Sequence, residues 1–382
     1  MRILVIIYEY PPVGGGGGRA AQDLCREMHK RGHQITVLTS NYRGLPRQET
    51  QNGVRIVRVP AFRRQPYKAG LLTMGAFVLT GLWLGLSLAR NWSPEVIHAH
   101  FAVPSGALAW AISRLTRTPY VLTAHLGDVP GGVPEKTSRW FRWFYPFTHP
   151  LWRDAAQVVA VSHYTRQLAL NHYQRDILVL PNGVNLAELN PGEIRVGNPP
   201  QIIFAGRFVP QKNLIQLINI LAEIKDLRWK CVLLGDGPLR RAVEETIKAR
   251  RLEARITLPG WVTPEQVIEQ FQKSDVLLMP SLSEGFPVVA VQAIAMGLAV
   301  VGSQVGGLVD LVEHGKNGFL YPSDDTAGMA NGLSKLLCDT QLLRAAREAS
   351  RRIAHRFDLQ AVADGYEQIF DNALAVIGGN TG

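Results

Sequence analysis

The stretch Ser283-Glu284-Gly285-Phe286-Pro287 lies between two short apolar runs, Val276–Met279 and Ala299–Gly302. Apolar runs of this length that alternate with helical patterns are typical of parallel strands joined by helices. The stretch therefore occupies the turn between a buried strand and a helix expected over Val288–Met296. Because parallel sheets bind ligands outside the carboxyl ends of their strands, this turn is a candidate binding loop.

The same alternation continues through all 382 residues. A segment rich in Pro, Gly and Asn over residues 190–200 predicts a linker between two series of strands. We expect an α/β fold of two doubly wound, Rossmann-like domains, over residues 1–190 and 198–358, that face a central cleft, with a last segment over 359–382. The expected strands are 2–7, 34–39, 54–59, 96–100, 120–123, 157–161, 178–180, 201–205, 230–234, 256–258, 276–279, 299–302 and 318–321.

The composition is that of a globular protein, with 46% hydrophobic and 19% charged residues. Cys25, Cys231 and Cys338 are scattered and lack the spacing of metal ligands, which favours a reducing compartment. The first apolar run, Ile3–Ile7, ends at Glu9 and is too short for a signal peptide. We therefore expect a cytoplasmic protein.

Positive charge is concentrated in the first half of the chain. Residues 1–190 hold 21 Lys and Arg against 10 Asp and Glu, a net charge of +11. The remainder holds 20 (41 − 21) against 21 (31 − 10), a net charge of −1. This asymmetry indicates that the first half meets an anionic ligand or surface. The alternative is that the charge serves solubility, but solubility does not require the charge to be concentrated in one half.

Two segments of the first half are unusually apolar. Ala69–Ala89 contains no charged residue, yet its four glycines and its place between strands of one sheet favour a core helix or a membrane-surface helix over a spanning one. Arg139–Tyr145 continues to Phe147 and Trp152. Its aromatic residues at 140, 143, 144 and 147 share one helical face, which predicts a core-facing helix, with contact to a lipid interface as the alternative.

A run of glycines, Gly14–Gly18, follows the first strand and precedes a helical pattern from Arg19. Backbone amides in such a loop can approach an anion closely. A dinucleotide site would require an acid at the end of the second strand, where Ser40-Asn41-Tyr42 stands instead. No Gly-Lys-Ser/Thr motif follows any glycine loop, so the pattern does not favour a nucleoside triphosphatase.

The second half carries a sharper set of residues. Arg207 and Lys212 follow the first strand of that domain and could neutralise a diphosphate without a metal. Glu284 could hydrogen bond sugar hydroxyls, and Gln292 lies about two helical turns further on. Gly235-Asp236-Gly237-Pro238 forms another strand-to-helix turn. These residue types together suggest an enzyme that handles a nucleotide-sugar.

His125 stands at the carboxyl end of a strand in the first domain, three residues before Asp128. A lone histidine is most often a buried, hydrogen-bonded one, but this position at a ligand-binding edge makes a functional role equally plausible. His98 and His100 share a strand without a third ligand at useful spacing, so we expect no metal site.

The order and spacing of the motifs resemble the GT-B glycosyltransferases of family 4, which are retaining and use a nucleotide-sugar. The motifs that carry the resemblance cover nearly the whole chain: 14–19, 31–39, 96–100, 161–165, 181–185, 206–212, 235–238, 280–287, 306–307 and 313–318. The resemblance implies a metal-independent hexosyltransferase without a cofactor, whose C-terminal helix crosses back to the first domain.

The resemblance also implies roles for individual residues. Arg207 and Lys212 should bind the donor diphosphate, and Glu284 with the backbone of Gly285-Phe286-Pro287 should meet the donor sugar. His125 should approach the reacting sugar. The other implied site residues are Gly15, Gly16, Gly17, Gly235 and Gln292 on the donor side and Arg19 and Asp128 on the acceptor side.

Two residues depart from the family pattern. Gln292 replaces the usual second Glu, which contacts ribose, and Leu126 replaces the first glycine of the usual His-Gly-x-Asp motif. Neither change removes Arg207, Lys212 or Glu284, so we expect an active enzyme.

The sequence therefore predicts transfer of a hexose from a UDP-sugar, with UDP-glucose as the first choice, to a polysaccharide or lipid-linked saccharide. The basic first half and the apolar segments suggest peripheral contact with the inner face of the cell membrane. The alternatives are an epimerase or phosphorylase on the same fold and a non-catalytic sugar-nucleotide binding protein. Nucleic-acid binding is disfavoured because no recognition module is present.

Overall fold

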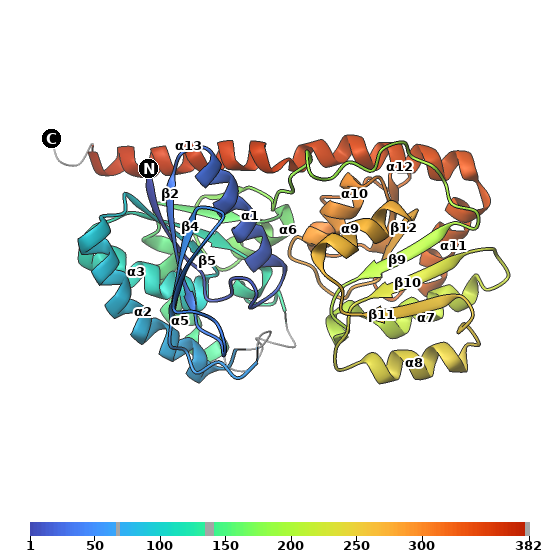
Figure 1. Ribbon diagram of the computed structural model, residues 1–382, viewed down its shortest axis with the longest axis horizontal. Helices are drawn as coiled ribbons and strands as arrows, with labels where there is room; N and C mark the ends of the chain where they lie inside the picture. Colours follow the sequence, from blue (N-terminus) through green and yellow to red (C-terminus); the bar gives the residue numbers. More distant parts are fainter. Residues whose placement is uncertain (66–68, 134–140, 379–382) are drawn as a thin grey trace. The chain divides into compact units, whose positions relative to one another are not determined.

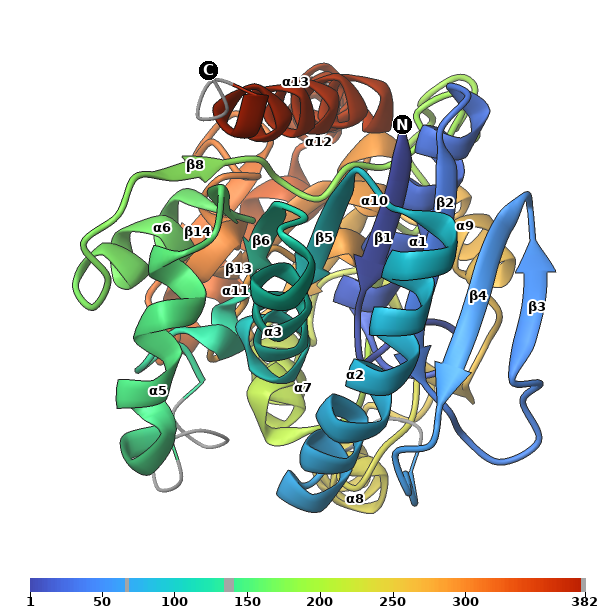
Figure 2. The same cartoon turned by 90° about the vertical axis from the view of Figure 1, so that its left-hand side faces the viewer.

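The structure is a computed structural model that describes residues 1–65, 69–133 and 141–378 (Figures 1 and 2). The chain forms two compact units. Unit 1 comprises residues up to Gly183 together with the chain from Leu359 onward, and unit 2 comprises Val184–Asp358. The first segment of unit 1 ends at Gly183. The sequence suggested that the first domain ends at residue 190. Residues 190–198 belong to unit 2.

Unit 1 is built on a sheet in the order β3-β4-β2-β1-β5-β6-β7-β8. All neighbouring strands in it are parallel except β3 and β4 at one edge (Figure 2). The strands are β1 (Arg2–Ile6), β2 (Gln34–Ser40), β3 (Gln48–Gln51), β4 (Val54–Val59), β5 (Val96–His100), β6 (Tyr120–Ala124), β7 (Gln157–Ala160) and β8 (Ile177–Val179).

Helices cover both faces of this sheet. Side chains of α2, α3, α5 and α6 join one buried cluster with Leu4 and Ile6 of β1, whereas α1 and α13 pack with Ile3 and Val5 on the other face. The helices are α1 (Gly16–Lys30), α2 (Leu71–Trp92), α3 (Ala107–Thr116), α5 (Phe141–Arg153), α6 (His163–Leu170) and α13 (Leu359–Gly378), with short helical turns η1 (Ala102–Gly106) and η2 (Leu126–Asp128).

The C-terminal helix α13 is tied to unit 1 by polar contacts as well as by packing. Arg31 donates from Nη1 to the Glu367 carboxylate at 2.8 Å, and the His33 ring nitrogen Nε2 lies 2.7 Å from the other Glu367 oxygen. These hydrogen bonds lower the pKa of Glu367, with His33 as the first cause. The Arg31–His33 motif therefore anchors α13.

Unit 2 contains a six-stranded parallel sheet in the order β11-β10-β9-β12-β13-β14. Its strands are β9 (Gln201–Ala205), β10 (Lys230–Leu234), β11 (Ile256–Gly260), β12 (Val276–Met279), β13 (Ala299–Ser303) and β14 (Gly318–Tyr321). Its helices are α7 (Leu214–Glu223), α8 (Arg240–Ala249), α9 (Pro264–Gln272), α10 (Val288–Ala295), α11 (Thr326–Cys338) and α12 (Thr340–Ala354), with turns η3 (Pro210–Lys212), η4 (Gly306–Leu308) and η5 (His355–Phe357).

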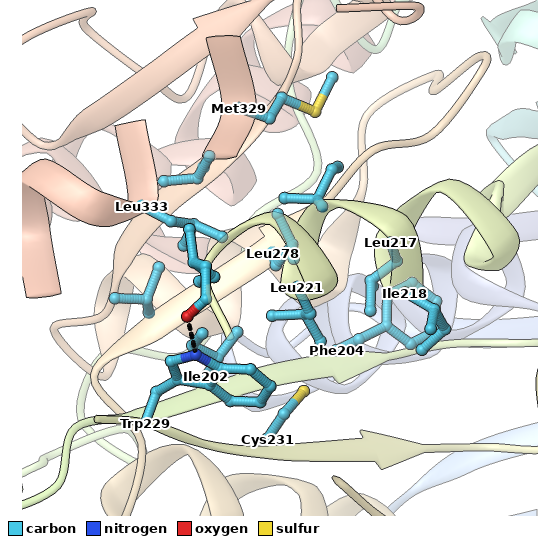
Figure 3. Close-up of a cluster of buried hydrophobic side chains, with 14 of the residues drawn as sticks. Ile202, Phe204, Leu217, Ile218, Leu221, Trp229, Cys231, Leu278, Met329 and Leu333 are labelled. Carbon is cyan, nitrogen blue, oxygen red and sulfur yellow. Dashed lines mark hydrogen bonds between the residues drawn. The ribbon is translucent and has the colours of Figure 1, made fainter. Parts of the chain in front are cut away.

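The core of unit 2 forms where one face of this sheet meets α7, α8 and α11. Figure 3 shows part of this cluster, in which Trp229 lies beside Cys231 and its indole Nε1 donates to the carbonyl of Ile224 at 2.8 Å. Burial of the indole N–H with a partner avoids the cost of an unpaired donor. The strand order in both units is that of a doubly wound fold, and the predicted fold class is confirmed.

Three local predictions need correction. Helix α1 begins at Gly16 rather than at Arg19. The antiparallel strand β3 was not predicted, because its sequence, Gln-Glu-Thr-Gln, has no apolar alternation. Phe147 was expected to face the core but is 74% exposed, whereas Trp152 is buried and stacks on Tyr173 at 4.1 Å. Trp140 and the side chains at 143 and 144 lie outside the described residues.

Candidate active site

The carboxyl ends of β9 and β12 mark the point in unit 2 where the strand order reverses. Ligands of doubly wound sheets bind in the crevice at this reversal, because the loops that leave the two strands turn to opposite faces. The loop after β9 carries Arg207 and Lys212, and the loop after β12 carries Glu284. The fold therefore brings these three predicted residues to one edge of one sheet.

Three hydrogen bonds join these two loops. The Leu282 amide donates to the Gln211 carbonyl at 2.8 Å, and the Gln211 side chain donates from Nε2 to the Ser283 carbonyl at 2.8 Å. The third contact is the ion pair between Lys212 Nζ and Glu284 Oε1 at 2.5 Å. The two loops therefore form one polar structure.

The Lys212–Glu284 pair is largely removed from solvent, with side-chain exposures of 16% for Lys212 and 6% for Glu284. Charge interactions are strengthened where water is excluded, so this pair responds strongly to any further charge placed beside it. The sequence assigned Lys212 to a diphosphate and Glu284 to a sugar. In the structure the two side chains contact each other, and half-buried Arg207 lies in the same loop as Lys212.

Glycines allow the neighbouring loops to come close to this structure. Gly235 has φ +129°, and a Cβ there would lie 1.9 Å from the Gly206 carbonyl oxygen. Gly306, at φ +52°, lies so close to the Glu284 backbone that a Cβ would overlap its carbonyl oxygen. The Gly307 amide donates to the carbonyls of Glu284 and Gly285. The close packing and hydrogen bonds of η4 therefore fix the backbone of the turn that carries Glu284.

The other residues predicted on the donor side lie in the turn after Glu284 and on α10. The Phe286 ring is buried against Phe357, with 5.4 Å between ring centroids, so only its backbone can meet a ligand at this turn. Pro287 is the buried residue that precedes α10, and Gln292 is half-buried on that helix. Gly285 is half-buried between Glu284 and Phe286.

A second group of predicted residues gathers in unit 1. Gly15 precedes α1, and Gly16 and Gly17 form its first turn. A Cβ on Gly17 would lie 2.9 Å from the Phe101 ring and 3.2 Å from the His125 ring. Only glycine therefore lets the start of α1 approach His125. Arg19 is half-buried and donates to Gln22 within α1 at 3.1 Å.

The His125 side chain is buried, and its ring stacks on Phe101 at 4.2 Å. Burial lowers its pKa to about 4, so the ring is neutral at pH 7. Its Nε2 atom has no hydrogen-bond partner within the described part of the chain. A neutral imidazole with an unsatisfied nitrogen is suited to hydrogen bond a ligand hydroxyl.

Asp128 holds the loop that carries His125. Its carboxylate accepts from the His125 amide at 2.7 Å and also from the amides of Ala102 and Val103. Burial raises the pKa of Asp128 to about 7. Asp128 was expected on the acceptor side. In the structure it is buried and its carboxylate is occupied by backbone amides, so it acts as a positioning residue.

Family models match both units of the chain. The model described as Glycosyltransferase Family 4 matches residues 14–188, and the model described as Glycosyl transferases group 1 matches residues 188–353. The two matches together account for the Gly15–Gly17 turn and His125, and for the Arg207, Lys212 and Glu284 loops. The chain is a GT-B glycosyltransferase of the family 4 type.

Individual proteins agree with this assignment. The putative teichuronic acid biosynthesis glycosyltransferase TuaC of Bacillus subtilis is 29% identical over 81% of this chain and 83% of its own. The sucrose-phosphate synthase of Thermosynechococcus elongatus has a TM-score of 0.84 at 22% identity and covers 98% of this chain and 99% of its own. Anabaena HepE in complex with UDP-glucose has a TM-score of 0.76 at 21% identity, with 97% and 98% covered.

The structure of this glycosyltransferase also reveals residues that the sequence did not assign to the site. His98 and His100, considered only as metal ligands, are buried beside His125, with 4.2 Å between the first two rings and 5.9 Å between those of His100 and His125. His98 lies 2.8 Å from the Thr123 hydroxyl, which in turn lies 2.9 Å from the Tyr366 hydroxyl of α13. The two histidines are two residues apart in a buried strand, β5, and therefore point to the same face of the sheet. This spacing was the signal that the sequence offered.

These histidines make the stability of the glycosyltransferase sensitive to mild acid. Burial lowers the pKa of His98 to about 3 and of His125 to about 4, and that of His100 also falls well below 6.5. Between pH 6.5 and 4 the unfolded chain binds protons that the folded chain excludes, so the free energy of unfolding decreases as pH falls, by up to about 1.4 kcal/mol per pH unit for each histidine. Asp128, whose pKa is raised, makes the folded protein more stable as pH falls, but this is one group and the three histidines have the opposite effect.

The measurement is urea unfolding at pH 7 and pH 5, with near-ultraviolet circular dichroism as the probe. We expect lower stability at pH 5 and a weaker pH dependence for His98→Gln, which removes one of the three groups. Equal stability at the two pH values would contradict the neutral state of this cluster.

Proposed function

We propose that the enzyme transfers a hexose from a UDP-sugar to a saccharide or lipid-linked saccharide, with retention of the anomeric configuration and without a metal ion. The observation that carries the proposal is the buried contact between Lys212 and Glu284 at the strand reversal of unit 2, in the same loop as Arg207. This trio has a net charge of +1, which suits a dianionic diphosphate beside a neutral sugar.

The three charged side chains have different roles in this proposal. Arg207 and Lys212 stabilise the negative charge that develops on the diphosphate as the bond from the anomeric carbon to the phosphate oxygen breaks. Glu284 holds Lys212 in position and accepts hydrogen bonds from donor-sugar hydroxyls. The acceptor oxygen bonds to the anomeric carbon on the face that the diphosphate leaves, and its proton passes to the departing phosphate oxygen. The products are a glycoside and a nucleoside diphosphate.

His125 is assigned to a sugar hydroxyl. Its unsatisfied Nε2 and neutral ring suit it to form a hydrogen bond with a hydroxyl, not to neutralise phosphate. Gly15, Gly16 and Gly17 are assigned to the donor phosphates because the first turn of α1 presents backbone amides without side chains. Arg19 is assigned to the acceptor side.

UDP-glucose is the preferred donor in this proposal. The support is the likeness to Anabaena HepE, solved with UDP and glucose and with UDP-glucose. The acceptor is proposed to be a growing saccharide, in line with the similarity to TuaC, the putative teichuronic acid biosynthesis glycosyltransferase. Gln292 is assigned to the ribose diol, since an amide both donates and accepts.

The experiment is a thermal-shift panel of UDP, GDP and ADP and their glucose derivatives, with EDTA present. At a concentration about 100 times the Kd, the correct nucleotide should raise the midpoint of unfolding by about 5 to 10 °C. UDP release from UDP-glucose should then be measured in EDTA. The Lys212→Ala variant should lose the shift, whereas Arg241→Ala on the exposed face of α8 should keep it.

Other outcomes would replace this proposal. A shift with GDP or ADP alone would change the donor, and loss of activity in EDTA would refute metal independence. A new sugar epimer formed without acceptor would favour the epimerase alternative. Nucleotide binding without turnover of any donor would favour a non-catalytic binding protein.

A further inference from the structure

Helix α2 leaves an apolar surface exposed on the outside of unit 1. Its 22 residues contain one charged side chain, Arg90. Leu72, Leu79 and Trp83 follow one another along one stripe and are 90%, 69% and 83% exposed. An outer helix of a globular domain normally turns polar residues to water, so an apolar outer stripe requires an explanation.

The inner side of α2 is fixed by close packing on α3. A Cβ on Gly81 would lie 2.6 Å from the Leu108 side chain, and one on Gly85 would lie 2.3 Å from Ile112. Phe77 is buried between these helices and the sheet. Helix α2 cannot rotate to bury its outer stripe, because its inner face would then leave the core. The stripe therefore stays exposed in folded unit 1.

Helices α3 and α5 share with α2 the lack of acidic residues. Helices α2, α3 and α5 lie on the same side of the sheet (Figure 2) and carry one, one and two Arg residues, with no Asp or Glu. Helices α3 and α5 also expose one large apolar side chain each, Leu115 and Phe147, at 65% and 74% exposure. On the other face of the sheet, α1 and α13 carry two and three acidic residues.

Helices α3 and α5 also expose arginines. The side chains of Arg114 on α3 and Arg153 on α5 are 61% and 72% exposed. Both contact Asp154, which follows α5, so the pair keeps a net positive charge. Exposed Leu and Trp together with a net positive charge on the same layer of helices match the boundary between the headgroups and acyl chains of an anionic bilayer.

We propose that the outer face of α2, α3 and α5 binds an anionic phospholipid membrane, with α2 lying in the plane of the headgroups. Among the described helices, α2 has the length and apolar composition to cross a bilayer. Spanning would require Phe77, Gly81 and Gly85 to leave α3, and it would separate β4 from β5, between which α2 runs. Binding in the plane uses only the exposed stripe. The inference does not depend on the proposed donor or acceptor.

The test is flotation of the full chain, purified without detergent, with vesicles of phosphatidylcholine alone or mixed with phosphatidylglycerol. We expect the wild type to float with the mixed vesicles and less with phosphatidylcholine, and to be partly released by high salt. The triple variant Leu72→Gln, Leu79→Gln, Trp83→Gln should bind at least about a hundredfold more weakly, since three apolar insertions are lost. Trp261→Gln is the matched control, an exposed Trp of unit 2.

A fluorescence measurement makes the assignment specific to α2. Trp83→Phe should reduce the blue shift of tryptophan emission that vesicles cause, and Trp261→Phe should not. Thermal unfolding of the triple variant should match that of the wild type because the three side chains are exposed. UDP-sugar turnover without vesicles should also be unchanged, which separates this proposal from the catalytic one.

Three results would overturn the proposal. One is absence of flotation with the mixed vesicles, and another is equal flotation of the triple variant. The third is that the wild type does not bind vesicles but forms a dimer, seen in size-exclusion chromatography with light scattering, and that the triple variant is a monomer. That result would assign the surface to a second copy of the chain.

Discussion

Replacement of Lys212 by alanine is expected to lower kcat/KM for glycosyl transfer by about a hundred- to a thousandfold, because loss of one fixed group that stabilises transition-state charge costs about 3–4 kcal/mol. The same change leaves the Glu284 carboxylate, 6% exposed, without its cation. Breaking a buried pair in this way costs up to about 3–5 kcal/mol of stability. Activity and stability should therefore fall together in Lys212→Ala, and each must be measured separately.

A double-mutant cycle separates the two effects. Glu284→Gln keeps the shape of the side chain and removes its charge, and Lys212→Met keeps most of the length of the lysine without its ammonium group. Measured by urea unfolding, each single change should be destabilising, and the Lys212→Met, Glu284→Gln double variant should recover a large part of the loss. Measured as UDP release, the double variant should stay as inactive as Lys212→Met.

The outcome that contradicts the assignment is specific. Should UDP release return in the double variant along with stability, the pair would be a structural contact and the catalytic role would be wrong. Should nucleotide binding persist in Lys212→Met while turnover disappears, Lys212 would act on the transition state alone. Arg241→Met, with a 90% exposed side chain, provides the reference for an inconsequential loss of charge in unit 2.

The sequence predicted the sheets well because their signals are local. Each buried parallel strand is a short apolar run, and nearly all of the predicted runs match strands of the structure within one or two residues. Strand β3 escaped detection because an edge strand in antiparallel pairing with one neighbour needs no apolar side chains. The early start of α1 was not predicted because glycines are poor helix formers. The close approach of the helix to His125 and Phe101, which requires a glycine at position 17, is a tertiary contact that the sequence does not show.

The site was predicted as a set of residues but not as a set of contacts. Strand ends gave the position of Arg207, Lys212 and Glu284 at one edge. The contact between Lys212 and Glu284 joins residues 72 apart through two loops, and no pattern in the chain encodes it. Likewise, the apolar run of α2 allowed a core helix or a membrane helix. Only the packing of Gly81 and Gly85 on α3 determines which face is buried.

The second large effect is expected at Arg347 of α12, whose side chain is 3% exposed. Its guanidinium donates from Nε to the Gly297 carbonyl at 2.7 Å and from Nη1 to the Arg195 carbonyl at 2.8 Å, and it pairs with Asp275. Asp275 also accepts from the amides of Gly197 and Gln201, the second at 2.8 Å.

This network explains why the segment expected to be a linker belongs to unit 2. Residues 195–201 reach α12 and the start of β12 mainly through Arg347 and Asp275. A further hydrogen bond runs from Gln201 Nε2 to the Ser274 hydroxyl at 2.9 Å. Burial lowers the pKa of Arg347, but a guanidinium remains charged at neutral pH. Arg347→Met therefore leaves the Asp275 carboxyl group buried without its cation, at 1% side-chain exposure, and should destabilise unit 2 by about 3–5 kcal/mol.

The measurement is differential scanning calorimetry with and without the nucleotide that the thermal-shift panel selects. Ligand binding should move the transition of unit 2, which identifies it, and Arg347→Met should lower that transition by about 6–20 °C. Arg347→Lys keeps the charge but cannot reach both carbonyls and Asp275 together, so an intermediate loss is expected. If Arg347→Met instead shifts the transition no more than Arg241→Met, the Arg347 contacts contribute nothing to the stability of unit 2, and residues 195–201 are held in place without them.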